Sequence, residues 1–385
     1  MLNNPFYKII NTKKFLYLSI VITFSIISFY IIDEGPNISS PDTILHLKWA
    51  DSLIQLKFNL YNFYTQNPFV TPTYFYTIQI ILVALAKFFF GSHWYYLLFG
   101  FNLLLVLLSI IIFSKSLLIV GVRPIIISLS VLIILISPDW MTFPSWILTD
   151  TTYSFLIIFT TYIIIKSIRR EKFSYLILIF LLIIMVFTRP AFPPIILTIV
   201  TFIAIYKYKI YINPKLIFLF IFLFFLIIPL CFAGLHYIGK IYLSDINQIN
   251  YWLKLTDKGI VVWKRYETYI EPPVNYTDHV YFYFLRLVSF FKPYAITFSK
   301  FHIIVNSFQL FYFTVSILIW SILGGKKNIL DMTVIFILLL SFSVAAFHAF
   351  VLIDWDWRYR YPVILPLMMI LPISIEILFR KYLKT

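Results

Sequence analysis

Apolar residues dominate this chain in long runs that short polar or charged stretches separate. Many of the runs approach the length of about 20 residues that an α-helix needs to cross the hydrocarbon core of a bilayer. The pattern therefore predicts an all-α, polytopic integral membrane protein with about ten transmembrane helices. The apolar runs lie at about 15–32, 74–90, 95–114, 124–138, 150–168, 173–188, 191–206, 216–234, 303–322, 329–350 and 361–379.

Clusters of basic residues between the runs set the predicted orientation, because Lys and Arg are enriched in cytoplasmic loops. All clusters share one side only if segment 74–90, which Pro72 and Gly91 bracket, dips into the outer leaflet without crossing it. Both termini are then cytoplasmic, and the large outer loops are 33–94 and 235–302. The basic clusters are Lys8/Lys13/Lys14, Lys115/Arg123, Lys166/Arg169/Arg170/Lys172, Lys207/Lys209/Lys215, Lys326/Lys327 and Arg380/Lys381/Lys384.

The domain organisation that we expect is a single transmembrane domain over residues 1–385. The first apolar run follows several lysines, and no small-residue cleavage site follows it, so we expect an uncleaved anchor. No long polar segment follows the last run, so we expect no separate soluble C-terminal domain. Richness in Ile, Phe, Lys, Asn and Tyr is typical of an AT-rich bacterial genome, and the predicted location is the cytoplasmic membrane of a bacterium.

Composition and missing motifs exclude several classes of protein. The chain is 61% hydrophobic and 12% charged, whereas a soluble domain has about 25% charged residues. The net charge of +15 does not indicate nucleic acid binding, because the basic clusters lie on the predicted inner face, where they contact anionic lipids. The sequence contains no HExxH, paired-cysteine, Walker, GxGxxG or GxSxG motif. Common metalloprotease, nucleotide-binding and serine-hydrolase chemistries are therefore not indicated.

The leading candidate for chemistry is Asp42, which follows the first predicted span. It opens the stretch 41–50, and Leu45, Trp49, Leu53 and Leu56 then recur on one face of a helix. His46 is four residues further on, so its side chain and that of Asp42 can point the same way. A carboxylate at the membrane surface can act as a general base or bind a divalent cation. The alternative is that Asp42 only caps the helix.

Two further candidates lie at predicted span ends on the same face. Asp150 opens an apolar helix, where an acid is costly unless it caps, pairs or faces a cavity. Arg189 stands before Pro190, which interrupts a helix and frees backbone groups. A guanidinium there can bind a phosphate in a bidentate fork. The alternatives are helix capping for Asp150 and snorkelling to lipid headgroups for Arg189.

Charged and aromatic residues alternate in segment 354–361 before the last apolar run. Arg358 and Arg360 are placed to hold a phosphate or pyrophosphate. Asp354 and Asp356 can instead neutralise them as surface pairs, and the Trp and Tyr residues are also typical of an interfacial aromatic belt.

The order of these segments resembles the GT-C superfamily of membrane glycosyltransferases, which includes lipid-linked aminoarabinose transferases and protein O-mannosyltransferases. The stretch from Asp42 to Ala50 resembles the first outer loop of that family. Four further stretches are similar to family segments, in the same order: 71–74 with the run ending at Phe90-Gly91, 148–150 after Pro138, 188–190, and 358–359 with Pro362 and Pro366. The chain departs from the pattern at His46, where Tyr is commoner, and at Asp150, where Glu is often found.

The resemblance implies an enzyme that moves a sugar from a polyprenyl-phosphate donor to a cell-envelope acceptor, on the outer face of the membrane and with inversion. Asp42 would be the general base, and Asp150 would place the acceptor or share a cation. Arg189, Arg358 and Arg360 would stabilise the leaving phosphate.

The resemblance leaves supporting groups and partners less defined. His46, Asp33 and Glu34 are expected to support the site, the two acids as a further acidic wall or only as the flank of the first span. No cofactor is required, although Mg or Mn could bind Asp42 and Asp150. The acceptor would be a lipid, a glycan or a protein, recognised mainly by loop 235–302.

Three rival classes of function remain open from the sequence. A lipid-glycan flippase would need ionisable residues within several spans, whereas the predicted spans are close to pure Ile, Leu and Phe. A glycan polymerase or ligase would share the lipid-linked donor and the basic outer loops. A structural subunit would use Asp42 only as a helix cap.

Overall fold

The structure is a computed structural model of the chain. It describes residues 13–66, 73–210, 213, 215, 276–293, 299–324, 328–350 and 357–382. These residues form α-helices and short 3₁₀ turns, and no strand occurs among them beyond one isolated β-bridge between Asn37 and Trp146. The all-α prediction is confirmed for this part of the chain.

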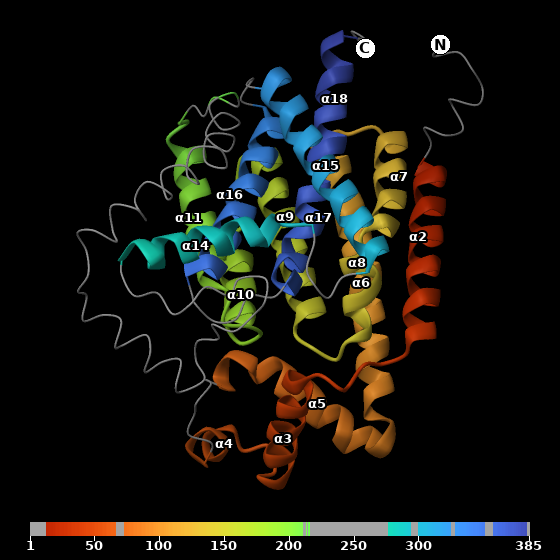
Figure 1. The fold of residues 1–385 in the computed structure, drawn as a ribbon, viewed down its shortest axis with the longest axis vertical. Coiled ribbons are helices and arrows are strands. Elements are labelled where there is room, and N and C mark those ends of the chain that lie inside the picture. The colour runs from red at the N-terminus through yellow and green to blue at the C-terminus, as the bar shows by residue number, and fades with distance from the viewer. Residues whose placement is uncertain are drawn as a thin grey trace.

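Long apolar helices run side by side as a bundle (Figure 1). The helix α6 packs along α9, α15 along α18, α2 along α7, and α11 along α16. The core between them is built from aromatic and branched aliphatic side chains such as Trp320, Phe113 and Phe336, all of which are buried. The bundle contains α2 (Lys13–Glu34), α6 (Trp94–Val120), α7 (Pro124–Ile133), α8 (Pro138–Thr142), α9 (Asp150–Arg170), α10 (Tyr175–Val186), α11 (Pro193–Lys207), α15 (Lys300–Leu323), α16 (Ile329–Phe350), α17 (Tyr361–Met368) and α18 (Ile370–Tyr382). The helix α14 (Tyr276–Phe291) lies across the long helices and contacts α16 (Figure 1).

Six helical stretches in the described residues are long and apolar enough to cross a bilayer, or seven if a bent pair is one span. The chain is thus a multi-pass membrane protein, but the prediction of ten spans is not met. Predicted runs 173–188 and 191–206 form helices of only 12 and 15 residues, and run 216–234 lies outside the described residues. The candidate spans are Lys13–Glu34, Thr73–Val120, Asp150–Arg170, Lys300–Leu323, Ile329–Ala349 and Arg358–Tyr382, and the bent pair is Pro124–Ile136 with Pro138–Ser145.

Three helices gather at one end of the bundle, namely α3 (Pro41–Gln55), α4 (Leu60–Gln66) and α5 (Thr77–Phe90). Figure 1 shows α5 lying across this end, with α6 rising from it beside the other long helices. That segment 74–90 does not cross the membrane stays a prediction, since α5 and α6 together form the apolar helical stretch Thr73–Val120. The start of α2 and the end of α18 lie at the opposite end of the bundle.

The helix α3 begins differently from the prediction. Ser40 is its N-cap, because the Ser40 side chain accepts a hydrogen bond from the Thr43 amide at 3.0 Å. Pro41 follows at the first helical position, where its missing N–H costs nothing. The capping alternative for Asp42 is therefore wrong, and its side chain is available for another contact.

The apolar face predicted for α3 is packed in part. Leu53 is buried, and Trp49 packs against His46 and Tyr76, whereas Leu45 is 37% exposed. Thr43 is buried on this helix as well. An apolar side chain is not forced inward where lipid can cover it, so large apolar residues alone do not define the packed face.

Hydrogen bonds join the loop between α2 and α3 to the segment before α9. The Asn37 amide donates to the Ser145 carbonyl at 2.8 Å, and the Ile147 amide donates to the Asn37 carbonyl at 3.2 Å. The Thr43 hydroxyl also donates to the Ile147 carbonyl at 3.2 Å. These bonds hold the start of α3 beside the start of α9, although about 100 residues separate them in the chain.

Candidate functional site: two aspartate–arginine pairs

The first pair joins Asp42 at the start of α3 to Arg358 before α17. Arg358 Nη2 donates to Asp42 Oδ2 at 2.7 Å. The Asp42 side chain is 49% exposed and that of Arg358 is 21% exposed, so solvent reaches this pair. Partial burial raises the pKa of the Asp42 carboxyl, but the charge and hydrogen bond of Arg358, together with the charge of Arg189, outweigh it and hold that pKa below its ordinary value of 3.8. Asp42 is therefore an anion at neutral pH.

The second pair joins Asp150, the first residue of α9, to Arg189 in the turn between α10 and α11. Arg189 Nη1 donates to Asp150 Oδ1. The side chains of Asp150 and Arg189 are only 3% and 9% exposed, so this pair is buried. The Tyr153 hydroxyl donates to the Ala191 carbonyl at 2.5 Å, which ties the start of α9 to the turn that carries Arg189.

The two pairs lie next to each other, and we call these four side chains the charged cluster (Asp42, Asp150, Arg189 and Arg358). The guanidinium carbons of Arg189 and Arg358 lie 5.2 Å and 5.6 Å from the centre of the same aromatic ring, that of Tyr359. The Arg189 charge acts on Asp42, and the Arg358 charge acts on Arg189. Residues from four distant segments are thus brought to one place.

The contacts also decide between the alternatives left open for Asp150 and Arg189. Asp150 lies inside the first turn of α9, and its N-cap neighbour Thr149 makes no side-chain capping bond. Arg189 is turned into the protein, with its guanidinium against Asp150. Pairing therefore accounts for both buried charges, and neither capping nor snorkelling to lipid is needed.

His46 lies on the buried face of α3 and is 4% exposed. Its ring centre is 5.8 Å from that of Trp49 and 5.2 Å from that of Tyr76. Burial lowers the pKa of His46 to about 4, against the opposing effect of Asp42 and Asp150, so the ring is neutral at pH 7. Its Nδ1 atom is buried and has no hydrogen-bond partner in the described part of the chain.

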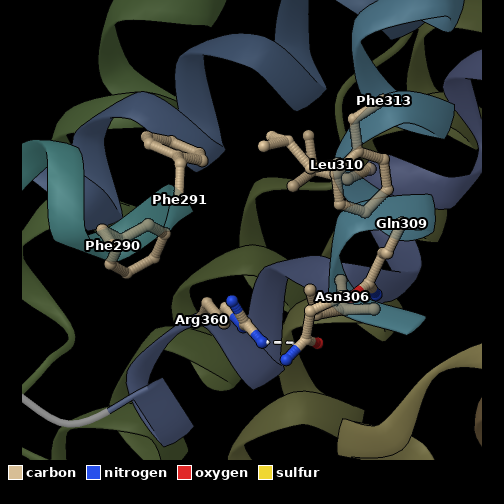
Figure 2. A pocket seen from close by; sticks show the side chains of 9 residues that line it. Phe290, Phe291, Asn306, Gln309, Leu310, Phe313 and Arg360 are labelled. Carbon is tan, nitrogen blue, oxygen red and sulfur yellow. Dashed lines mark hydrogen bonds between the residues drawn. The ribbon is translucent and has the colours of Figure 1, made fainter. Parts of the chain in front are cut away.

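Arg360 has partners of its own. It donates to the Asn306 Oδ1 atom at 2.8 Å and to the Lys292 carbonyl at 3.0 Å, and its Nε atom lies 3.7 Å from Asp139 Oδ1. Figure 2 shows Arg360 and Asn306 at the base of a small pocket between α14 and α15, whose walls carry Phe290, Phe291 and Phe313. The cavity of about 20 Å³ is of the size that holds one or two waters. No member of the charged cluster lines it.

The remaining predicted residues fall elsewhere or outside the described chain. Asp33 and Glu34 are exposed at the end of α2. Asp354 and Asp356 lie outside the described residues, and so does most of loop 235–302, of which 276–293 and 299–302 are described.

Two residues near the site were not singled out from the sequence. Asp139, in α8, is completely buried beside Arg360. The sequence feature that could have identified Asp139 is the stretch Ser137-Pro138-Asp139, which is typical of a helix start and lies at the end of an apolar run. Tyr359 stands between two predicted arginines, but only the packing shows that both cluster guanidiniums lie against its ring.

The charged cluster offers two guanidiniums to an anion. No group of three or more His, Cys, Asp or Glu side chains that could hold a metal occurs among the described residues, and binding of Mg or Mn by Asp42 and Asp150 stays a prediction. Both carboxylates of the charged cluster are instead held by arginines. Two adjacent guanidiniums can exchange these carboxylates for the oxygens of a phosphate, which they bind bidentately.

Comparison of the chain with protein-family models, curated proteins and solved structures found no match. The resemblance to GT-C glycosyltransferases therefore rests on the sequence motifs alone.

Proposed function

We propose that the chain is a membrane glycosyltransferase that moves a sugar from a polyprenyl-phosphate donor to a cell-envelope acceptor. The reaction takes place at the outer face of the cytoplasmic membrane, at the bundle end that carries α3 and α5. The proposal rests on one observation above all, which is the convergence of two carboxylates and two guanidiniums in the charged cluster. The order of the sequence motifs and the apolar bundle agree with it.

The two arginines match the charge of the leaving group. Breaking the bond between a sugar and a phosphate places negative charge on the phosphate oxygens, and fixed cations stabilise that charge most where water is scarce. Arg189 is buried and Arg358 is mostly buried. Each is neutralised by an aspartate in the unliganded chain, so an incoming phosphate has to replace the two carboxylates. Donor binding thereby releases both acids for the reaction.

Asp42 acts as the general base in this scheme. Its carboxylate takes the proton from the acceptor hydroxyl or amine, and the freed lone pair attacks the anomeric carbon. The bond from that carbon to the phosphate oxygen breaks, and polyprenyl phosphate leaves with the electron pair. A single displacement inverts the configuration at the anomeric carbon. Asp42 is the more exposed of the two acids, so an acceptor from the aqueous side can reach it.

Asp150 acts through its neighbours. It is buried, and it orients Arg189 before the donor arrives. Once the phosphate occupies Arg189, the Asp150 carboxylate can accept a hydrogen bond from a sugar or acceptor hydroxyl. The participation of Arg360 remains a prediction from the sequence, since its contacts are with Asp139, Asn306 and Lys292.

The proposal is tested by the chemical class of the donor. The purified chain in liposomes is given sugar-radiolabelled polyprenyl-phosphate sugars of several kinds or, in parallel, sugar-radiolabelled nucleotide sugars, together with envelope extract as the source of acceptor. Transfer of the labelled sugar to the acceptor is measured. We expect transfer from at least one lipid-linked sugar and none from nucleotide sugars. Arg189→Met should abolish transfer, whereas Lys87→Met, which removes a partly exposed cation at the same end, should retain it. Transfer from nucleotide sugars alone, or equal transfer by the Arg189→Met protein, would refute the proposal.

A further inference from the structure

The ring of Tyr359 contacts both arginines of the charged cluster. The guanidinium carbon of Arg189 lies 5.2 Å from the ring centre, and that of Arg358 lies 5.6 Å from it. Both distances are within the roughly 6 Å over which a guanidinium is attracted to the face of an aromatic ring.

A second ring fixes the position of Tyr359. The imidazole of His348, on α16, stacks on Tyr359 with ring centres 4.3 Å apart and an angle of 7° between the planes. Tyr359 belongs to the short 3₁₀ turn Trp357–Arg360, and the helix α16 contacts this turn. The ring is therefore held by a side chain from a helix of the bundle, and its position does not depend on the arginines alone.

The ring becomes more important when a phosphate binds. The contacts of Arg189 and Arg358 include, for each, an aspartate and the Tyr359 ring. A phosphate that binds both guanidiniums replaces the aspartates. The ring does not compete with the phosphate for hydrogen bonds, because a cation–π contact is an attraction between the ring and the whole guanidinium charge and needs no N–H donor.

We propose that Tyr359 is a positioning residue that holds Arg189 and Arg358 together in the orientation that receives the phosphate of a lipid-linked donor. This assignment rests on the proposed function. It names the aromatic ring as the active part of the side chain, since both cation contacts are to the ring. Phenylalanine at position 359 should therefore keep the affinity for phosphate, whereas an aliphatic residue should lower it.

The experiment measures the binding of farnesyl phosphate, a short prenyl phosphate without a sugar, to the purified full-length chain in detergent. The variants are Tyr359→Phe and Tyr359→Leu. The matched control is Tyr361→Leu, because Tyr361 is a buried tyrosine two residues away whose ring packs between Trp140 and Phe143. Thermal unfolding of each variant reports on folding independently of the ligand.

We expect wild type and Tyr359→Phe to bind with similar affinity, and Tyr359→Leu to bind about tenfold more weakly, because two cation–π contacts are lost. Tyr361→Leu should lower the unfolding temperature but keep the affinity. If Tyr359→Leu does not fold, His348→Leu takes its place, since it removes only the stacked ring and should weaken binding about threefold.

The outcomes separate this inference from the function on which it rests. If wild type does not bind farnesyl phosphate, the proposed function fails. If wild type binds and Tyr359→Leu binds equally well, Tyr359 is not a positioning residue while the function stands. Equal weakening in Tyr359→Leu and Tyr361→Leu would show a general effect of packing and would also overturn the assignment.

Discussion

The buried pair between Asp150 and Arg189 gives the sharpest prediction about stability. Arg189→Met removes the cation and leaves the Asp150 carboxylate, only 3% exposed, without its partner. Removing one member of a buried ion pair costs about 3–5 kcal/mol. The double variant Asp150→Leu/Arg189→Met leaves no unpaired charge, and replacing both members of such a pair by apolar residues is often close to neutral. We therefore expect the double variant to be more stable than Arg189→Met alone.

The free energy of unfolding can be measured by SDS titration in mixed micelles, with tryptophan fluorescence as the signal. The control is Lys87→Met, because Lys87 pairs with Asp51 at the surface, where the side chains are 24% and 50% exposed. Exposed pairs contribute about 0–1 kcal/mol. A cost for Arg189→Met no larger than that for Lys87→Met would show that the buried pair does not form. A double variant less stable than the single one would show that the pair stabilises the fold by itself.

Three further predictions concern single contacts. Burial lowers the pKa of His46 from 6.5 to about 4. The unfolded chain therefore binds a proton that the folded chain excludes, and the free energy of unfolding falls as the pH drops from 6.5 toward 4. His46→Phe should reduce this pH dependence when the free energy of unfolding is measured across that range. Ser40→Ala removes the N-cap of α3 and should cost about 1 kcal/mol of unfolding free energy. Glu376 is buried and accepts from Arg380 at 3.0 Å, so Glu376→Gln should cost about 1–3 kcal/mol, whereas a stability equal to wild type would show that this contact is absent.

The sequence could identify the members of the charged cluster but not their pairing. Asp150 stood out because an acid at the end of an apolar run is costly unless it caps, pairs or faces a cavity, whereas Asp42, Arg189 and Arg358 stood out as charges beside a helix start, a proline or an aromatic stretch. Asp42 and Arg358 are 316 residues apart in the chain, and no periodicity relates them. Which carboxylate pairs with which guanidinium depends on the tertiary packing of the helix ends. The sequence near each residue does not determine that packing.

Other errors have local explanations. Ser40 and Asp42 are both good capping residues, and Pro41 between them favoured Ser40, because proline is common directly after an N-cap. Apolar runs 173–188 and 191–206 were found, but their helices are shorter than the runs, since the turn around Arg189 and Pro190 interrupts them. On α3, Leu53 and Trp49 of the predicted apolar face are packed but Leu45 is exposed, because a lipid environment does not require every apolar side chain to be packed inside.

The most direct test of the charged cluster as a catalytic site is the rate of sugar transfer by Asp42→Asn, compared at equal amounts of folded protein. The control is Asp51→Asn, which changes an exposed acid on the same helix, paired with Lys87 outside the cluster. A general base typically contributes a factor of about 10²–10⁴ to the rate. The account predicts that Asp42→Asn loses at least about 100-fold in polyprenyl phosphate release, while Asp51→Asn stays near wild type. Release by Asp42→Asn at the wild-type rate would contradict it.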